Sequence, residues 1–582
     1  MTKFRVQKNS GTYAELLEAY GLANLLAEVL QRSDMDDQDI FLTDQGGFYE
    51  IQTETSVTEE LVRECRYFPL FRYIRQNNVS DIEGVYDYFD YPLQREWKKE
   101  RQNLLNKAYE KYRDESLNKE LKRIEHIYEE QKPIDVELDV CAQISTPNNI
   151  VSFLKLYRNF HDNRIIFTDI LAEIIKYYAV EVYDGKAFHK LVKSYVFEEQ
   201  VTATQLYNPH KGQGVAKPKA TGVNRINLDS SWIKETMKIS GALSDMICQL
   251  VKVGNSYDLK VSVPEYRQVN YYLKRKLLSK LKKYLKGNTP IKIDILNLLL
   301  MTEVFIQYRG NLGIRSVKEV VSGLHTVYQK DMGQNKAVIN IGYMQIPDFI
   351  YLKDADYDRE WLDILQEQRA IVGGITEKGE GIEGLVLYRN FLSASDVYSF
   401  FKFSFWYAGY AFSQSFKRYV RLFSIETLIK FHTNMDTHEL NLSEIISNKG
   451  FLAVAKAIRQ STVMLQYLPK EKRIYDIRYG IAQENKSKSY GDLAQFIGDF
   501  VAGYNEETAR VVEKRKKISE NTDQEKIRAN VKIEELNDFY SLLDRYGNRP
   551  QLVGALLASY GFARPSSTID KSIPMETETE EL

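Results

Sequence analysis

His161 and Asp162 form the dipeptide of this sequence best suited to metal-dependent hydrolysis. A metal-dependent phosphohydrolase can use such a pair, but it needs further His and Asp ligands at helical spacing, and none are evident nearby. We therefore expect a surface or capping pair. If the pair is catalytic instead, the protein would be a metal-dependent HD-type nuclease or phosphohydrolase.

His432 and His438, with Asp436 between them, could also coordinate a metal ion. Their six-residue spacing does not place two imidazoles on one helical face. The surrounding stretch FHTNMDTHEL has the composition of a polar connection. We expect a loop without a metal here.

The short motifs of common enzyme classes are missing from the sequence. It contains no GxxxxGK[ST], no strand-flanked GxGxxG, no HExxH and no GxSxG. Its three cysteines, Cys65, Cys141 and Cys248, form no CxxC pair, which excludes a cysteine-based zinc site and favours a reducing compartment. We predict a protein that is not an enzyme and that uses no metal or cofactor.

A basic, glycine-rich segment, LYNPHKGQGVAKPKATGVNR at 206–225, is better suited to binding than to catalysis. No Asp or Glu occurs from residue 201 to 227, and the glycines let a backbone approach a phosphate closely. The alternative is a mobile surface loop that is basic by chance. The candidate contacts are Lys211, Lys217, Lys219 and Arg225 for phosphate, Tyr207 for stacking, and Asn208, Gln213 and Asn224 for base edges or sugar.

A second basic segment, at 267–286, has the pattern of an amphipathic helix. Leucines recur every four residues from Leu273 to Leu285 and predict an apolar anchor. The opposite face of this helix would carry basic side chains and no acidic one, which suits contact with a phosphate backbone. A solvated helix face or a helix that lies on a membrane surface would have the same sequence pattern. The candidate contacts are Arg267, Lys274, Arg275, Lys276, Lys280, Lys282, Lys283 and Lys286.

The C-terminal third carries fewer cations at helical spacing. Lys456 and Arg459, three residues apart, share a helical face. Such a face is either solvated or part of a groove for single-stranded DNA. The further candidates are Arg418, Arg421, Arg473 and Arg478, beside Lys417 and Lys472.

These segments need a scaffold, and a chain of 582 residues is long enough for two or more domains. The net charge is −1, so a nucleic-acid site must come from local segregation of charge. No apolar signal core and no run of membrane-spanning length occurs, which predicts a cytoplasmic protein without a membrane partner.

Hydrophobic periodicity predicts an α+β fold, with a mixed but mostly helical N-terminal and middle region followed by an all-α bundle. We expect helices at 12–30, 95–131, 266–286 and 293–306, a hairpin at 41–51, and strands at 323–328 and 337–346. The predicted domains are 1–200 (α+β) and 201–372 (basic middle region). A glycine-rich linker at 373–392, a helical bundle at 393–565 and a disordered acidic tail at 566–582 complete the prediction.

Five segments resemble the large subunit of a type I CRISPR surveillance complex (Cascade) of the I-B-like kind. They are LYNPHKGQGVAKPKATG (206–222), GFLAVAKAIRQSTV (450–463), RIYDIRYGIAQE (473–484), FIGDFVAGYNEE (496–507) and LVGALLASYGFARP (552–565). They cover the helical third well and the middle region at one loop.

The resemblance implies a non-catalytic subunit for antiviral defence, located at the 5′-handle end of the crRNA. It would recognise the protospacer-adjacent motif in target double-stranded DNA, help to open the duplex, and recruit the helicase-nuclease. Implied partners are crRNA, target DNA with its displaced single strand, and the backbone, handle-capping and small subunits; the C-terminal bundle is similar to the small subunits. Base pairing with the guide would read the long sequence. Besides a nucleic-acid-binding subunit and an enzyme, the third class of function considered is a scaffold protein that binds no nucleic acid.

Overall fold

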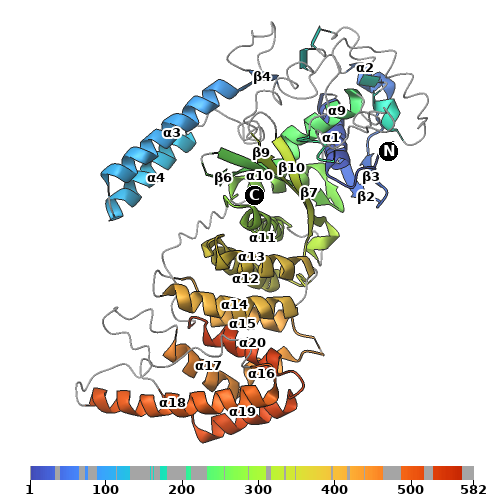
Figure 1. Ribbon diagram of the computed structural model, residues 1–582. Helices are drawn as coiled ribbons and strands as arrows, with labels where there is room; N and C mark the ends of the chain where they lie inside the picture. Colours follow the sequence, from blue (N-terminus) through green and yellow to red (C-terminus); the bar gives the residue numbers. More distant parts are fainter. Residues whose placement is uncertain are drawn as a thin grey trace, which may run out of the picture. The chain divides into compact units, whose positions relative to one another are not determined.

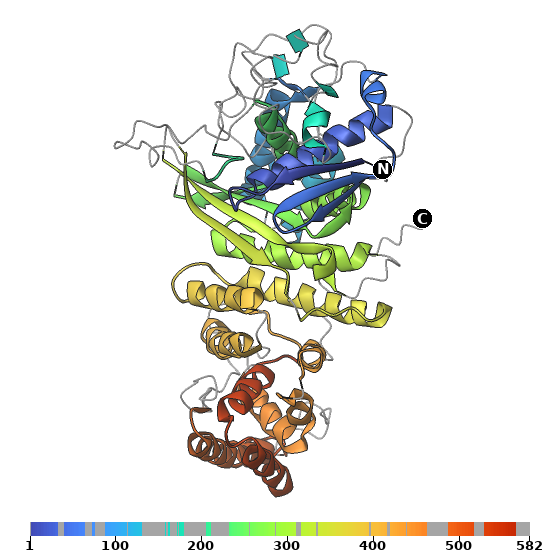
Figure 2. The ribbon, with the colours of Figure 1, turned by 90° about the vertical axis from the view of Figure 1, so that its right-hand side faces the viewer.

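The structure is a computed structural model with an α+β fold that is mostly helical (Figures 1 and 2). It describes residues 2–32, 40–64, 73–75, 88–112, 114–130, 157–158, 161–162, 171–172, 174–179, 205–210, 232–254, 256–285, 287–309, 316–332, 336–347, 349–394, 397–415, 420–437, 439–462, 487–516 and 529–565. Within these residues, no helix combines the length and apolarity that a membrane span requires.

The chain divides into two compact units. The N-terminal unit contains Met1–Tyr308 and Ser316–Ile346, and the C-terminal unit contains Arg309–Arg315 and Pro347–Leu582. The predicted divisions at residue 200 and at 373–392 are therefore not boundaries between compact units. Strand pairing and helix packing join segments on either side of residue 200, as described below.

The first sheet of the N-terminal unit has the strand order β1-β3-β2-β8 and is antiparallel. Its strands are β1 (Thr2–Gln7), β2 (Ile40–Asp44), β3 (Phe48–Thr53) and β8 (Gln268–Asn270). The hairpin predicted at 41–51 is confirmed: Gly46 has a φ of +80°, and its N–H donates to Asp44 Oδ1 at 2.8 Å. Through β8, the start of the basic segment is held in a sheet built mainly from the first 53 residues.

The second sheet of this unit has the order β10-β9-β7-β6, also antiparallel. Its strands, green to yellow-green in Figure 2, are β6 (Ile247–Val253), β7 (Ser256–Tyr266), β9 (Val321–Asp331) and β10 (Lys336–Gln345). The two strands predicted at 323–328 and 337–346 are confirmed, whereas β6 and β7 were not predicted. Helix α11 (Pro290–Tyr308) packs on one face, where Lys260 Nζ lies 2.7 Å from Asp294 Oδ1.

Helices α1 (Ala14–Arg32) and α9 (Trp232–Asp245) lie side by side (Figure 1). Their backbones cross closely at two glycines. A Cβ on Gly21 would lie 1.8 Å from the Met237 carbonyl oxygen, and a Cβ on Gly241 would lie 2.0 Å from that of Leu17. Any larger residue at either position would push the two helices apart.

We expect Gly21→Ala and Gly241→Ala each to lower the free energy of unfolding of the N-terminal unit. Overpacking typically costs about 1–3 kcal/mol, which exceeds the gain of about 0.5–1 kcal/mol that alanine brings to a helix. Urea unfolding measures the effect. Gly47→Ala is the control, since a Cβ there meets nothing within 4 Å; equal stability of all three variants would contradict the close crossing.

A helical hairpin occupies part of the segment predicted as one long or broken helix. Helices α3 (Tyr91–Lys111) and α4 (Asp114–Glu130) pack against each other around Trp97 and Tyr128, whose ring centroids are 5.9 Å apart. Arg101 Nη2 donates to Glu125 Oε2 at 2.6 Å across the pair. Short elements complete this unit: α2 (Glu59–Glu64), β4 (Tyr73–Arg75), β5 (Tyr88–Asp90), the basic helix α10 (Tyr271–Lys283) and the 3₁₀ turn η5 (Val317–Glu319).

The described elements of the C-terminal unit are all helices, as predicted for the end of the chain, but they begin before residue 393. They are α12 (Ala355–Gly374), α13 (Glu380–Ala394), α14 (Val397–Ser415), α15 (Ile425–Asn434), α16 (Leu442–Ser447), α17 (Lys449–Ser461), α18 (Tyr490–Lys516), α19 (Ile533–Arg545) and α20 (Pro550–Gly561). An aromatic cluster forms part of the core; Phe400 lies 4.6 Å from Phe431 and 5.1 Å from Phe391, centroid to centroid.

The stretch predicted as a linker at 373–392 is mostly helical: Gly373 and Gly374 end α12, residues 380–392 belong to α13, and a short turn at 375–379 joins the two helices. Ile375 in this turn is fully buried, and Gly379 has a φ of +54°, which suits glycine. The tail at 566–582 lies outside the described residues.

Candidate nucleic-acid interface

Helix α10 begins at a polar cap and is anchored by an apolar face. The side chain of Asn270 accepts hydrogen bonds from the backbone N–H groups of Tyr272 and Leu273. The buried leucines are Leu277, Leu278 and Leu281, while Leu273 and Leu285 are half-buried. The apolar face predicted from the leucine spacing is therefore confirmed at its two central leucines, Leu277 and Leu281.

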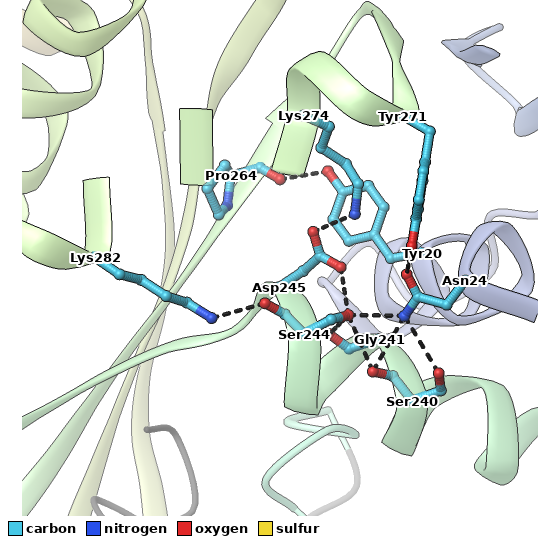
Figure 3. Close-up of polar contacts among 10 residues, drawn as sticks. All are labelled: Tyr20, Asn24, Ser240, Gly241, Ser244, Asp245, Pro264, Tyr271, Lys274 and Lys282. Carbon is cyan, nitrogen blue, oxygen red and sulfur yellow. Dashed lines mark hydrogen bonds and ion pairs between the residues drawn. The ribbon is translucent and has the colours of Figure 1, made fainter. Parts of the chain in front are cut away.

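Lys274 is turned toward the interior and is not a surface contact, which corrects its place among the candidate nucleic-acid ligands. Its side chain is 1% exposed and forms an ion pair with Asp245 of α9, which is 2% exposed. Figure 3 shows the two groups facing each other, with Lys274 Nζ 4.3 Å from the ring centroid of Tyr20. Lys274 lies three and four residues before Leu277 and Leu278, which places it on the same helical face.

Serine and asparagine side chains extend this buried polar network toward α1. Asn24 Nδ2 donates to Ser244 Oγ at 2.8 Å, and Tyr271 of α10 donates its hydroxyl proton to Asn24 Oδ1 at 2.9 Å (Figure 3). Lys282 Nζ donates to the Ser244 carbonyl at 2.7 Å, in the last turn of α9, where the helix dipole favours a cation. Two of the eight basic residues in the segment therefore fix α10 to its neighbours.

The outward face of α10 holds most of the remaining described cations. Arg275, Lys276 and Lys283 are exposed, and Lys280 is half-exposed; Arg267 is exposed too but precedes the helix, between β7 and β8. Lys276 and Lys280 also lie near the ring of Tyr308, at 5.6 and 5.3 Å from its centroid. Two exposed tyrosines, Tyr272 and Tyr284, flank the helix and are 51% and 42% exposed.

This composition is suited to a nucleic-acid strand. Cations pair with phosphates, and exposed aromatic rings offer stacking faces. Between residues 267 and 286 no acidic side chain is present to repel the backbone. Lys286 lies outside the described residues.

Only the beginning of the glycine-rich loop is described, and it corrects two candidates. Tyr207 and Asn208 are both fully buried, so neither offers a stacking face or a base contact. Asn208 Nδ2 donates to Glu235 at 2.8 Å, and Lys238 Nζ donates to Asn208 Oδ1 at 2.9 Å. The asparagine thus joins a buried ion pair on α9. The other candidates, Lys211, Gln213, Lys217, Lys219, Asn224 and Arg225, lie outside the described residues.

The cations of the C-terminal unit do not form the shared face that spacing predicts. Lys456 on α17 is exposed, but Arg459 turns inward and its Nη2 donates to the Tyr560 carbonyl at 3.0 Å. Burial lowers the pKa of Arg459 to about 10, so it stays charged at neutral pH. Arg421 is half-buried, with its carbonyl accepting from the Tyr407 hydroxyl. Arg418, Arg473 and Arg478 lie outside the described residues.

The sequence's hydrolytic candidates do not assemble a metal site among the described residues. His161 Nδ1 lies 3.5 Å from Asp162 Oδ1, and no group of three His, Cys, Asp or Glu in the described ranges could hold a metal ion. Asp436 accepts from the N–H groups of Leu442 and Ser443 at the start of α16. His438 lies outside the described residues.

His432 is on α15 and fully buried, which corrects its assignment to a polar loop. Its Nδ1 lies 3.2 Å from the Tyr560 hydroxyl, and burial lowers its pKa to about 3. In the unfolded chain histidine has a pKa near 6.5, so below that pH the unfolded state binds a proton that the folded state does not. Stability is therefore lost as the pH falls from about 6.5 toward 3.

We expect this histidine to contribute a slope of up to about 1.4 kcal/mol per pH unit to the unfolding free energy of the C-terminal unit. Urea unfolding at several pH values between 7 and 5 measures the slope. His432→Gln should flatten it, while costing stability at pH 7. The exposed His126→Gln is the control, and an unaltered slope in His432→Gln would contradict the assignment.

Sequence reasoning missed a cavity of about 470 Å³ in the N-terminal unit. Its lining includes Lys8, Tyr49, Glu265, Arg267 and His325. These residues come from four separate segments, so no local motif marks them. Only the cation Arg267 was recognised, through its place in the basic segment.

The sequence matches no protein-family model, and no curated protein matches it significantly.

Proposed function

We propose that this chain is a non-catalytic large subunit of an RNA-guided CRISPR surveillance complex and that it binds nucleic acid through α10. The observation that carries the proposal is the outward face of α10, where exposed cations lie between two exposed tyrosines in a stretch of sequence, 267–286, that contains no acidic residue. Such a face tracks a phosphate backbone without reading its sequence. That property suits a protein whose target is selected by guide RNA.

The segments that resemble the Cascade large subunit give independent support. Three of the five lie on α17, α18 and α20, which pack together in the C-terminal unit. Their packing is close: a Cβ on Gly561 would lie 2.6 Å from Ile458 Cγ2. The resemblance therefore falls on residues that build one bundle rather than on scattered surface positions.

Under this proposal the chain works with crRNA, target double-stranded DNA, the other Cascade subunits and a helicase-nuclease. It would recognise the protospacer-adjacent motif and recruit the helicase-nuclease, which would cut the target DNA. The C-terminal bundle would lie along the displaced strand, as the resemblance to small subunits implies.

Purification of the tagged chain, co-expressed with its neighbouring genes, tests the proposal. We expect RNA of uniform length to co-purify, together with the products of those genes. A preparation without RNA that also fails to bind DNA would favour a scaffold protein instead. Loss of target cleavage in His161→Ala, with binding and nuclease recruitment intact, would favour the HD-type enzyme.

A further inference from the structure

The cavity of about 470 Å³ lies where residues from the two four-stranded sheets of the N-terminal unit come together. Lys8 follows β1, Tyr49 lies on β3, Glu265 ends β7, His325 lies on β9 and Tyr343 on β10. Its volume falls in the range of about 300–1,000 Å³ typical of small-molecule sites.

The carboxylates of the cavity are already engaged within the protein. Glu265 accepts from the Tyr49 hydroxyl at 2.6 Å and lies 3.3 Å from Lys8 Nζ and 3.5 Å from His325 Nε2. Burial opposes its ionisation, but the hydrogen bonds and charges of these neighbours nevertheless lower its pKa to about 2. Asp44 Oδ1 also lies 2.8 Å from Lys8 Nζ. Lys8 therefore pairs with two of the three carboxylates that line the cavity, and the third, Glu15, accepts from the Ser10 hydroxyl at 2.5 Å.

Among the charged residues that line the cavity, Arg267 is exposed, whereas Lys8, Asp44 and Lys318 are half-buried and Glu15 and Glu265 are buried. The backbone of Arg267 is fixed on both sides, since its N–H donates to the Val320 carbonyl and its own carbonyl accepts from the Asp44 N–H, each at 2.7 Å. Its guanidinium forms no hydrogen bond or ion pair with the residues that the structure describes. A guanidinium can donate two N–H groups to two oxygens of one phosphate.

An aromatic pair lies on the wall formed by β9 and β10. The ring centroids of His325 and Tyr343 are 4.7 Å apart, and Tyr343 is 39% exposed. Gln345 follows on the same strand, and its exposed amide can both donate and accept hydrogen bonds. A flat heteroaromatic group could stack on the ring while the amide pairs with its edge.

We propose that this cavity binds a phosphomonoester of nucleotide size, with its phosphate on Arg267 and its base against Tyr343 and Gln345. The exposed guanidinium of Arg267 and an aromatic–amide wall match the two ends of a mononucleotide. The ligand is either a free nucleotide or the phosphorylated 5′ end of a strand. This site goes beyond the proposed function and does not depend on the surface of α10.

Calorimetric titration of the purified full chain tests the site with AMP, GMP, CMP, UMP and inorganic phosphate as probes. We expect saturable binding of at least one nucleotide, with phosphate alone binding more weakly. Arg267→Gln and Tyr343→Ala should each weaken nucleotide binding about 10-fold or more. The matched controls are Lys252→Gln and Tyr257→Ala, two exposed residues that do not line the cavity.

Short oligonucleotides with and without a 5′-phosphate distinguish the two ligand sources. Displacement of the nucleotide by the phosphorylated form alone would assign the site to strand ends, and no displacement would assign it to free nucleotides. The absence of saturable binding by every probe and by the phosphorylated oligonucleotide would overturn the proposal. So would equal weakening in the control variants. Failure of α10 to bind long nucleic acid would leave these titrations unchanged, so the two proposals fail separately.

Discussion

Replacing Lys274 by methionine is expected to lower the free energy of unfolding of the N-terminal unit by about 3–5 kcal/mol. The side chain is buried, and its loss leaves the carboxylate of Asp245 without its cation in an environment that water does not reach. Asp245→Asn should cost a similar amount, because it leaves the ammonium group unpaired. Replacing both partners by apolar residues should cost much less than either single change.

Hydrogen exchange followed by mass spectrometry measures this effect for each segment separately. In Lys274→Met and Asp245→Asn, we expect peptides from α9 and α10 to exchange faster than in the unsubstituted protein. Peptides from the C-terminal unit should exchange at an unchanged rate. Lys283→Met is the matched control, since Lys283 is an exposed lysine on the same helix. If Lys274→Met exchanged at the rate of Lys283→Met, the buried ion pair would not be important for stability.

Neutralising the outward face of α10 is expected to produce the largest change in nucleic-acid binding. The variant combines Arg275→Gln, Lys276→Gln and Lys283→Gln, which removes three exposed charges and leaves the buried face intact. Each phosphate contact contributes about 0.7–0.9 to the slope of log affinity against log salt concentration. The triple variant should therefore lower the slope by about 2–3 and weaken binding at physiological salt.

Fluorescence anisotropy with single- and double-stranded DNA at several salt concentrations gives this slope. A control variant with the same change in net charge combines Lys99→Gln, Lys252→Gln and Lys330→Gln, three exposed residues outside α10. If the control lowered the slope as much as the α10 variant, binding would depend on overall charge and not on this helix. An unaltered slope in the α10 variant would indicate a solvated surface.

Much of the fold could be predicted because hydrophobic periodicity and residue composition can be read from short stretches of sequence. The hairpin at β2–β3, the helix α11 and the strands β9 and β10 all follow from patterns within about a dozen residues. The burial of Lys274 could also have been predicted, because its spacing from Leu277 places it on the apolar face. Its partner Asp245 could not, since a contact 29 residues away leaves no local pattern.

The errors have the same physical origin. The glycines around Ile375 suggested a linker, yet most of them lie in α12 and α13, and the short turn between these helices contains the buried Ile375. Burial of this kind depends on distant neighbours and leaves no local pattern. Tyr207 and Asn208 looked like surface contacts because their segment is basic, but α9 supplies the polar partners that permit the burial of Asn208. The cavity has no sequence signature because its lining residues range from Lys8 to Gln345.

The close crossing of α1 and α9 has a consequence for how the chain is synthesised. About 200 residues separate the end of α1 at Arg32 from the start of α9 at Trp232. At about 5–20 residues per second, a ribosome needs roughly 10–40 s to make that stretch. During this interval the apolar surface of α1 lacks the partner that covers it in the folded protein. The first helix therefore gains its covering partner only late in synthesis, and the N-terminal unit can complete its folding only after translation has passed β10, which ends at Gln345.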